Sequence, residues 1–441
     1  MSTPAQNLTD AYRCCDPDQP LEPSDSRYLD LSDVRGLKLL ASTIRRNLDR
    51  RSDDAIGFEK YLVSGHRGCG KSTELLRLKA ELERYSYKVV YFDIEAQLDL
   101  ADVSYIDVLL TIAKEIEGQL RQANIYINPQ LLESLANWFV ERIEEKEQKT
   151  LLEGTARSEA ELGGGVPLLA KLLGKLTGEI KYGSTSRVQT RQVLERDIAA
   201  FIQQLNLLLI DARNQIQRSG FKDLVVIVDG LEKIHFRELS QGNNSHTDIF
   251  VHHAEQLKAP CCHIVYTTPI SLAYNTNLGN DFDDVIIVPM VKVMNPDGLQ
   301  RLRELMALRI DIHAVFDHPD LLDALILHSG GVMRDLMRLV RMSTDTDDAK
   351  IGQAEVTYAK ASLSQEYDRT IHADEIELIK TVDQEKRVSG DNTFGRLLFN
   401  RVVLEYRNGE RWAAVHPAVL TIAWVQQRLH PASAGAANGA T

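Results

Sequence analysis

Short apolar runs alternate with amphipathic stretches through the middle of this 441-residue chain. Short apolar runs bounded by turn residues predict buried strands, and apolar residues that recur every three or four positions predict helices. The predicted strands are Lys60 to Ser64, Lys88 to Ile94, Leu224 to Val228, His263 to Thr267 and Asp284 to Val291. One predicted helix between them carries Leu75, Leu78 and Leu82 on one face. The other predicted helices span Val103 to Leu120, Arg191 to Arg218 and Asp248 to Leu257. Strands that alternate with helices predict an α/β fold whose parallel sheet is covered on both faces.

The same pattern divides the chain into successive parts. Residues 1–28 are rich in Pro, Asp and Ser and predict a flexible arm, and residues 29–294 form the α/β core. An insertion is expected at 127–190, where the alternation stops. Residues 295–364 predict a helical lid, 365–428 a domain of helices and one hairpin, and 429–441 a disordered tail. The hairpin is indicated by an Asn-Gly turn between the segments VVLEY and RWAAV.

Composition and charge narrow the class of protein. With 44% hydrophobic and 26% charged residues the chain is expected to be globular. No apolar run approaches the roughly 20 residues of a membrane span, and the N-terminus lacks a signal pattern, so a cytoplasmic location without membrane contact is expected. The net charge of −12 repels DNA, so any nucleic-acid contact would need a local basic patch. The five cysteines lack zinc-site spacing and are expected to be reduced thiols.

The segment SGHRGCGKST directly follows the first strand and opens the first helix of the core. It fits the pattern GxxxxGKS, in which glycines let backbone N–H groups surround phosphate oxygens, the lysine reaches the terminal phosphates and the serine binds Mg²⁺. The sequence therefore predicts a binding loop for a nucleoside triphosphate. Its candidate residues are Gly65, His66, Arg67, Gly68, Cys69, Gly70, Lys71, Ser72 and Thr73.

An acidic residue is expected on a neighbouring strand, because Mg²⁺ on a triphosphate needs a carboxylate ligand. The segment LVVIVDGLEKI supplies Asp229 at the end of an apolar run and Glu232 three residues later. Asp229 is the predicted magnesium ligand together with Ser72. Glu232 is a candidate general base for the attacking water, or else a carboxylate at the start of a helix.

These two segments resemble the AAA+ and STAND branches of the P-loop ATPases, with ATP and Mg²⁺ as ligands. VVIVDGLEKI is similar to the acidic strand of the STAND and NACHT form, although Glu232 and Lys233 stand where that form has Asp and Glu. The long gap between the two segments resembles the one in KAP-type ATPases, which carry an insertion at this place. The resemblance implies a three-layer P-loop NTPase core.

The resemblance extends to sensors and to the C-terminal region. Thr267 or Thr268 falls where the family has its first sensor, a polar side chain near the terminal phosphate. Thr268 is the candidate. The segment HSGGVMRDLMRLVR is similar to the second-sensor helix of replication initiators, with Arg334 as the sensor. Residues 366–426 look like the winged-helix domain of that branch. The arginines that could complete a neighbouring subunit's site are, by position, Arg301, Arg303 and Arg309.

The sequence supports an ATP-binding switch with several possible uses. The first is STAND-like signalling, for example in antiviral defence, by a homo-oligomer or with separate sensor and effector proteins. An alternative is an initiator-like ATPase that binds or remodels DNA through its winged helix. A third is a scaffold that binds nucleotide without turnover.

Overall fold

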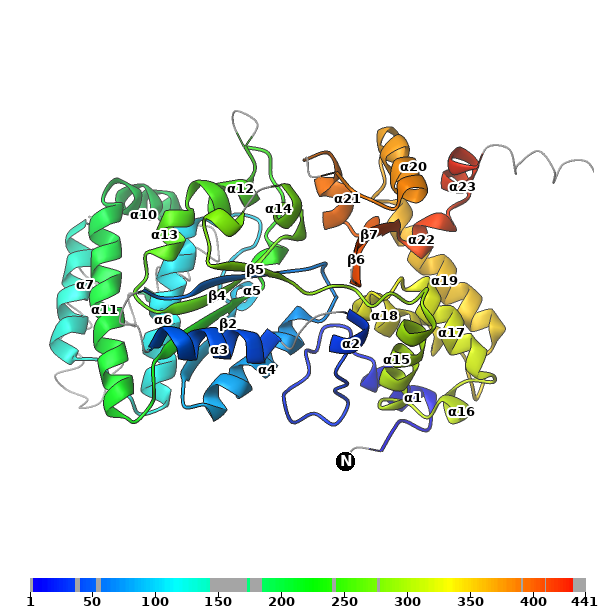
Figure 1. The fold of residues 1–441 in the computed structure, drawn as a ribbon, viewed down its shortest axis with the longest axis horizontal. Helices are drawn as coiled ribbons and strands as arrows, with labels where there is room; N and C mark the ends of the chain where they lie inside the picture. The colour runs from blue at the N-terminus through cyan, green and yellow to red at the C-terminus, as the bar shows by residue number, and fades with distance from the viewer. Residues whose placement is uncertain are drawn as a thin grey trace, which may run out of the picture.

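The computed structural model describes residues 3–35, 40–52, 57–142, 173–174, 185–239, 243–275, 278–389, 392–408 and 410–430. At its centre is a five-stranded parallel sheet of order β2-β3-β4-β1-β5 (Figure 1). The strands are β1 (Lys60–Ser64), β2 (Lys88–Asp93), β3 (Leu224–Asp229), β4 (His263–Thr268) and β5 (Asp284–Ile287). Because the strands are parallel, the loop after β1 and the acidic end of β3 lie at the same end of the sheet, where the strands have their carboxyl ends. Strand β4 lies between β1 and β3.

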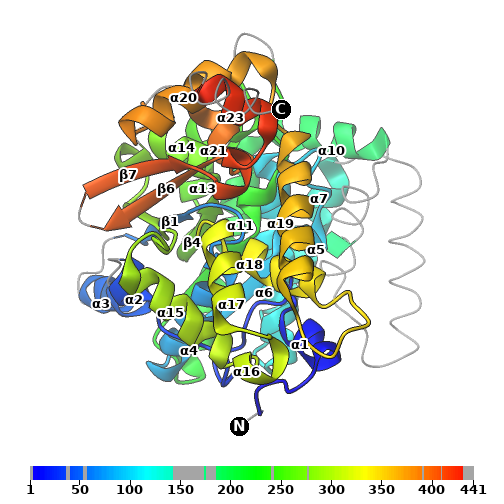
Figure 2. The same ribbon diagram turned by 90° about the vertical axis from the view of Figure 1, so that its right-hand side faces the viewer.

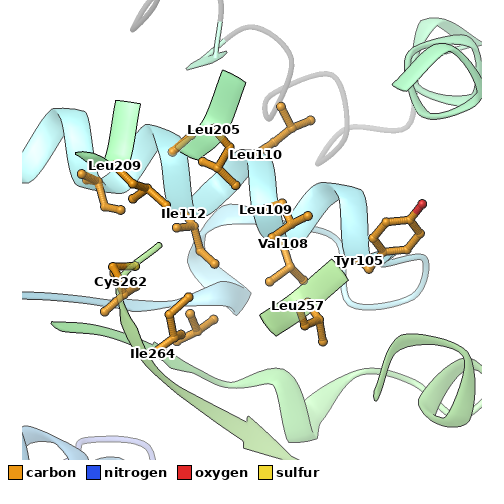
Figure 3. Packing of buried hydrophobic residues seen from close by; sticks show 14 of the residues in the cluster. Tyr105, Val108, Leu109, Leu110, Ile112, Leu205, Leu209, Leu257, Cys262 and Ile264 are labelled. Carbon is orange, nitrogen blue, oxygen red and sulfur yellow. The ribbon is translucent and has the colours of Figure 1, made fainter. Parts of the chain in front are cut away.

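Helices cover both faces of the sheet, as the alternation predicted. On one face, apolar residues of the strands pack against α6 (Tyr105–Gln122), α11 (Ile198–Arg218) and α13 (Ala254–Lys258). Figure 3 shows Val108 and Ile112 of α6 between Leu205 and Leu209 of α11 and Ile264 of β4. The opposite face packs against α3 (Leu40–Ser52) and α4 (Lys71–Arg84). The α/β class is therefore confirmed.

Several boundaries differ from the prediction. The last strand of the sheet is only Asp284–Ile287, shorter than expected. In place of one helix over Asp248 to Leu257 the chain forms α12 (Ser245–Thr247), a π-helical turn η3 (Asp248–His252) and α13. The expected long helix is two helices, α10 (Thr185–Arg196) and α11, interrupted at Asp197. Such short interruptions leave the apolar period unchanged, so the sequence pattern does not reveal them.

The insertion expected at 127–190 lies largely outside the described residues. Its described part includes α7 (Pro129–Arg142) and the first half of α10, and both pack beside α11 at the outer side of the core (Figure 1). Smaller helical pieces of the core are α5 (Ile94–Gln97), η1 (Leu231–Lys233), α14 (Ile270–Asn275) and η4 (Leu278–Asn280). Of the helices that the structure describes, none is long and apolar enough to cross a membrane.

The region after the core, which we call the lid, is helical as predicted, and its role as a lid stays a prediction. It consists of α15 (Pro296–Ala307), α16 (Ile312–Val315), α17 (Pro319–His328), α18 (Met333–Ser343) and α19 (Gln353–Asp368). The N-terminal residues, which we expected to be a flexible arm, instead pack on this lid. Within residues 1–28 the chain forms α1 (Leu8–Cys14), Ala5 pairs with Ile310, and Ala11 is fully buried. Helix α2 (Ser32–Arg35) follows at the start of the predicted core. Ala5, Ala11 and Cys15 are buried in the same apolar cluster as the lid helices, although the segment looks polar overall.

The C-terminal region contains the predicted hairpin. Strands β6 (Val403–Asn408) and β7 (Glu410–Val415) pair in antiparallel fashion (Figure 2), with Asn408 opposite Glu410. The other elements are η5 (Ala373–Glu375), α20 (Ile376–Glu385), η6 (Asn392–Phe394), α21 (Gly395–Phe399), α22 (Pro417–Leu420) and α23 (Ala423–Leu429). That this region is a winged helix stays a prediction, and nearly all of the expected tail lies outside the described residues.

Candidate functional site

The loop after β1 leads directly into the N-terminus of α4, which begins at Lys71. Gly68 and Gly70 have φ angles of +80° and +99°, a backbone conformation that L side chains rarely adopt. The 14-residue helix that follows directs its positive end at this loop. A glycine-rich loop that ends at a helix N-terminus is a phosphate-binding arrangement.

Lys71 is buried, with a side chain that is 2% exposed. Its ammonium group donates to the carbonyl oxygens of Gly65 and His66, at 2.9 and 3.0 Å, and lies 3.1 Å from Glu232 Oε1. Burial disfavours the charge of Lys71, but the Glu232 carboxylate outweighs it, so the pKa of Lys71 is raised. The lysine is therefore fixed as a cation beside the loop.

Glu232 lies in η1, just beyond the end of β3, and its side chain is 6% exposed. Burial opposes its ionisation, but Lys71 and the Thr267 hydroxyl favour it, and the pKa of Glu232 falls below its usual value. Oε2 of this carboxylate is buried and has no hydrogen-bond partner among the described residues. A buried carboxylate oxygen normally has a partner, so this atom is an acceptor available to a bound water or ligand.

Asp229 ends β3 and is fully buried. Tyr91 in β2 donates its hydroxyl to Asp229 Oδ2 at 2.8 Å, and Ser72 forms a side-chain hydrogen bond with the same carboxyl group. Burial and the nearby charge of Glu232 raise the pKa of Asp229 to about 6. Asp229 and Ser72 therefore present two oxygen donors together, which is the donor type that Mg²⁺ prefers. Tyr91 gave no signal in the sequence.

The two candidate sensor threonines of β4 have different surroundings. Thr267 lies beside Glu232, and its Oγ1 accepts from the backbone N–H of Leu231 at 2.9 Å. The Thr268 hydroxyl is buried without a hydrogen-bond partner in the described structure. Successive residues of a strand face opposite sides of the sheet, so only one threonine can face Glu232. Thr267 therefore makes the contact with Glu232, and the sensor role of Thr268 stays a prediction.

Arg334 lies in the first turn of α18 and approaches the loop through its backbone. Its N–H donates to the carbonyl of Gly68 at 3.2 Å, and its guanidinium pairs with Asp18 at 2.9 Å. Arg67 lines the same cavity and has no ion-pair partner among the described residues. Two guanidinium groups thus face the space beside Lys71, and such groups suit a phosphate.

A cavity lies between the loop, the lid helix α18 and the N-terminal segment, which is residues 3–35. Its charged lining includes Arg67, Lys71, Glu232 and Arg334. Its apolar lining comes from the N-terminal segment and the lid and includes Leu21, Leu29, Leu31, Leu305, Met333 and Met337. No signal in the sequence indicated the N-terminal contribution, because the apolar residues of that segment have no period. The cavity thus has both charged and apolar residues in its lining.

The other loop residues have structural contacts. Cys69 is fully buried, and its carbonyl accepts from the Arg35 guanidinium at 2.6 Å. The Thr73 hydroxyl accepts from the backbone N–H of Leu21 at 3.2 Å. His66 is buried and contacts Leu398 and Glu405 of the C-terminal region. We call this region, residues 365–430, the C-terminal domain. Thr73, Leu21 and Arg35 line the cavity, whereas Cys69 and His66 are not part of its lining.

Lys233 occupies the position where the family that the sequence resembles has a further acid. Its ammonium group pairs with Asp93 at 3.0 Å and Glu95 at 2.6 Å, so it is neutralised locally. The three arginines considered for a neighbouring subunit are also engaged within their own chain. Arg301 pairs with Asp33 and Glu304, Arg303 pairs with Asp323, and Arg309 is buried. Burial and its hydrogen bonds to Arg27 O and Leu305 O hold Arg309 inside its own chain, so it cannot reach another subunit.

Comparison with known proteins gives structural likeness only. No family model and no curated protein matches the chain. Solved structures that are similar include the Walker-type ATPase paby2304 of Pyrococcus abyssi, at 12% identity and a TM-score of 0.41, covering 95% of this chain and 99% of that one. The Aeropyrum pernix ORC2 protein in its ADP form has 12% identity and a TM-score of 0.41, with coverages of 97% and 98%. A structure of Drosophila ORC bound to DNA has 11% identity and a TM-score of 0.42, with coverages of 97% and 92%.

The fold class follows from this chain's own sheet and loop. A parallel sheet between two helical layers carries a glycine-rich loop after β1, and an intervening strand separates that loop from Asp229 at the end of β3. This is the three-layer α/β fold of a P-loop NTPase.

Proposed function

We propose that the chain is a conformational switch that binds and hydrolyses ATP. The observation that carries this proposal is the buried contact between Lys71 and Glu232 at the edge of the sheet where Asp229 and Ser72 also meet. Phosphate groups would be bound by the backbone N–H groups of the loop and by the Lys71 ammonium. The apolar part of the cavity suits a planar base.

The residues present fit a magnesium ion. Ser72 and Asp229 would hold it, and a bound Mg²⁺ would offset the negative charge of the phosphate groups. Glu232 is ionised at neutral pH and keeps one buried oxygen without a partner. This oxygen can accept the proton of an attacking water, so Glu232 is the proposed general base.

The lid would respond to the terminal phosphate through Arg334. Its guanidinium is paired with Asp18 of the N-terminal segment, so a phosphate in the cavity would compete with that carboxylate. Exchange of one anionic partner for another would change how the lid and the N-terminal segment are held. Arg67 supplies a second positive charge from the loop itself.

A regulatory use of the STAND kind is our first proposal, with separate sensor or effector proteins or with self-assembly. The alternative is an initiator-like ATPase that contacts DNA through a winged helix formed by residues 365–428. The sequence places Arg407 and Arg411 on the two strands next to the hairpin turn, and this local positive charge supports that alternative. The net charge of −12 opposes it.

The decisive experiment compares wild-type protein with Lys71→Ala. We expect wild-type protein to bind and hydrolyse ATP in the presence of Mg²⁺ and Lys71→Ala to lose both activities. Since Lys71→Ala leaves Glu232 buried without its cation, the double variant Lys71→Met/Glu232→Gln controls for folding. Turnover that survives Lys71→Ala would refute the site, and binding without turnover would indicate a scaffold. Stimulation by double-stranded DNA that fades with salt would favour the alternative, and a change of size with ATP would support assembly.

A further inference from the structure

The loop residue His66 connects the nucleotide site to the C-terminal domain. Its imidazole is 1% exposed and reaches two backbone groups beyond the lid. Nε2 accepts from the N–H of Glu405 in β6 at 2.9 Å, and Nδ1 lies 3.2 Å from the carbonyl of Leu398 in α21. Since Nε2 accepts, the ring proton is on Nδ1, which donates to Leu398. One neutral imidazole therefore satisfies both groups, and burial lowers the pKa of His66 to about 3.

The backbone of His66 touches the centre of the site. Its carbonyl oxygen is one of the two loop acceptors that hold Lys71 Nζ, at 3.0 Å. The ring and this carbonyl belong to one residue, so the orientation of the carbonyl is restricted when the ring is anchored. A shift of Leu398 and Glu405 would therefore move an oxygen that accepts from the Lys71 ammonium.

The same C-terminal turn is held from a second side by the lid. Arg401, in this turn, pairs with the fully buried Asp335 of α18 at 3.1 Å. Tyr406 donates its hydroxyl to the carbonyl of Gly330 at 2.7 Å. The segment from Leu398 to Tyr406 thus contacts both elements that line the cavity, the phosphate loop and the approach to α18.

We propose that His66 is a positioning residue through which the C-terminal domain sets the conformation of the phosphate loop, so that domain docking and nucleotide binding strengthen each other. The proposal rests on the proposed function, because it takes the ligand to be a nucleotide. Coupling between two equilibria is reciprocal, so docking should tighten nucleotide binding by the same factor by which nucleotide tightens docking. The C-terminal domain is then part of the nucleotide site.

The test measures MgATP affinity and amide hydrogen exchange in full-length wild-type, His66→Ala and His66→Gln proteins. In the wild type, MgATP should slow exchange of the Glu405 N–H and of the segment 398–406. His66→Ala should weaken MgATP binding about tenfold and raise KM with little change in kcat, and nucleotide should no longer protect this segment. His66→Gln, which can still donate and accept, should recover part of the affinity.

His328→Ala is the matched control. His328 is buried in the lid, where it bonds to the Lys360 carbonyl, and it makes no contact with the loop. It should leave MgATP affinity unchanged. An equal loss of affinity in His328→Ala and His66→Ala would overturn the proposal, because general destabilisation would then explain both.

Two further outcomes separate this inference from the proposed function. Wild-type protein that binds MgATP through Lys71 but shows no change of exchange in 398–406 would overturn the inference alone. This measurement needs no variant, so it stands even if His66→Ala fails to fold. Wild-type protein that binds no nucleotide would overturn the proposed function and the inference with it.

Discussion

The backbone N–H of Arg334 in α18 donates to the carbonyl of Gly68 in the phosphate loop, with an N···O distance of 3.2 Å. A Cβ atom on Gly68 would lie 2.6 Å from the Cβ of Arg334, closer than side chains approach. The lid and the loop therefore meet backbone to backbone because residue 68 has no side chain. This contact brings the candidate sensor to the nucleotide site.

Gly68→Ala should separate the lid from the loop. The new methyl group clashes with Arg334 and also forces an L side chain into a φ of +80°. We expect at least a tenfold loss of MgATP affinity, measured by titration. Gly220→Ala is a matched control, because Gly220 has a φ of +86° with nothing within 4 Å of its Cβ position. It should show only the backbone strain of about 1–2 kcal/mol in unfolding experiments. Equal effects of the two variants on nucleotide affinity would contradict the importance of the contact.

Glu232→Gln should separate binding from hydrolysis. The amide cannot accept a proton, and Lys71 keeps its bonds to the Gly65 and His66 carbonyls. We expect ATP binding to persist while turnover falls by a factor on the order of 10²–10⁴. Glu95→Gln is the control, because Glu95 pairs with Lys233 and does not line the cavity. Normal turnover in Glu232→Gln would make Glu232 only the structural partner of Lys71.

Metal binding should weaken below about pH 6. The Asp229 carboxyl has its pKa raised to about 6 by burial and by the charge of Glu232, so protons compete with Mg²⁺ in this range. Affinity for Mg²⁺ should fall about tenfold per pH unit below this pKa and stay constant above it. Asp229→Asn should bind Mg²⁺ weakly and lose this pH dependence. An unchanged Mg²⁺ affinity between pH 7 and pH 5 in the wild type would argue against Asp229 as a ligand.

Asp335→Ala should destabilise the fold strongly. Asp335 is fully buried and contacts Tyr367 Oη at 2.6 Å, Arg401 at 3.1 Å and His416 at 3.4 Å. Burial opposes its charge, but Arg401 and His416 outweigh it and hold the pKa of Asp335 well below its usual range. Its contribution is therefore complete at neutral pH and is lost only as the pH falls through that low pKa. Removing the carboxylate leaves the partly buried Arg401 guanidinium and the buried Tyr367 hydroxyl without their partner, at a cost of about 3 kcal/mol in denaturant unfolding.

Asp10→Ala is the comparison for this last experiment. Asp10 pairs with Arg13 on the surface at 3.6 Å, and the two side chains are 51% and 74% exposed. Removing such a pair should change stability by less than about 1 kcal/mol. Similar losses in Asp10→Ala and Asp335→Ala would mean that the buried pair has no special role.

Local sequence predicted the core of the fold well. Strands β1 to β4 and the loop after β1 lie where the apolar runs and the GxxxxGKS pattern put them. Interruptions within helical stretches, as at Asp197, escaped the prediction because the apolar period continues through them. The candidate metal ligands Ser72 and Asp229 were also chosen from sequence, and they share a hydrogen bond in the structure.

The sequence by itself determined that a phosphate loop and an acidic strand end belong to one α/β core, because each strand and the loop motif are contiguous segments with their own local pattern. The order of the strands in the sheet came from the tertiary structure. Only the tertiary structure decided that Tyr91 holds Asp229, that Asp18 pairs with Arg334, and that His66 reaches Glu405. These contacts join residues far apart in the chain. They depend on how separately folded segments pack, and no local period or motif encodes that packing.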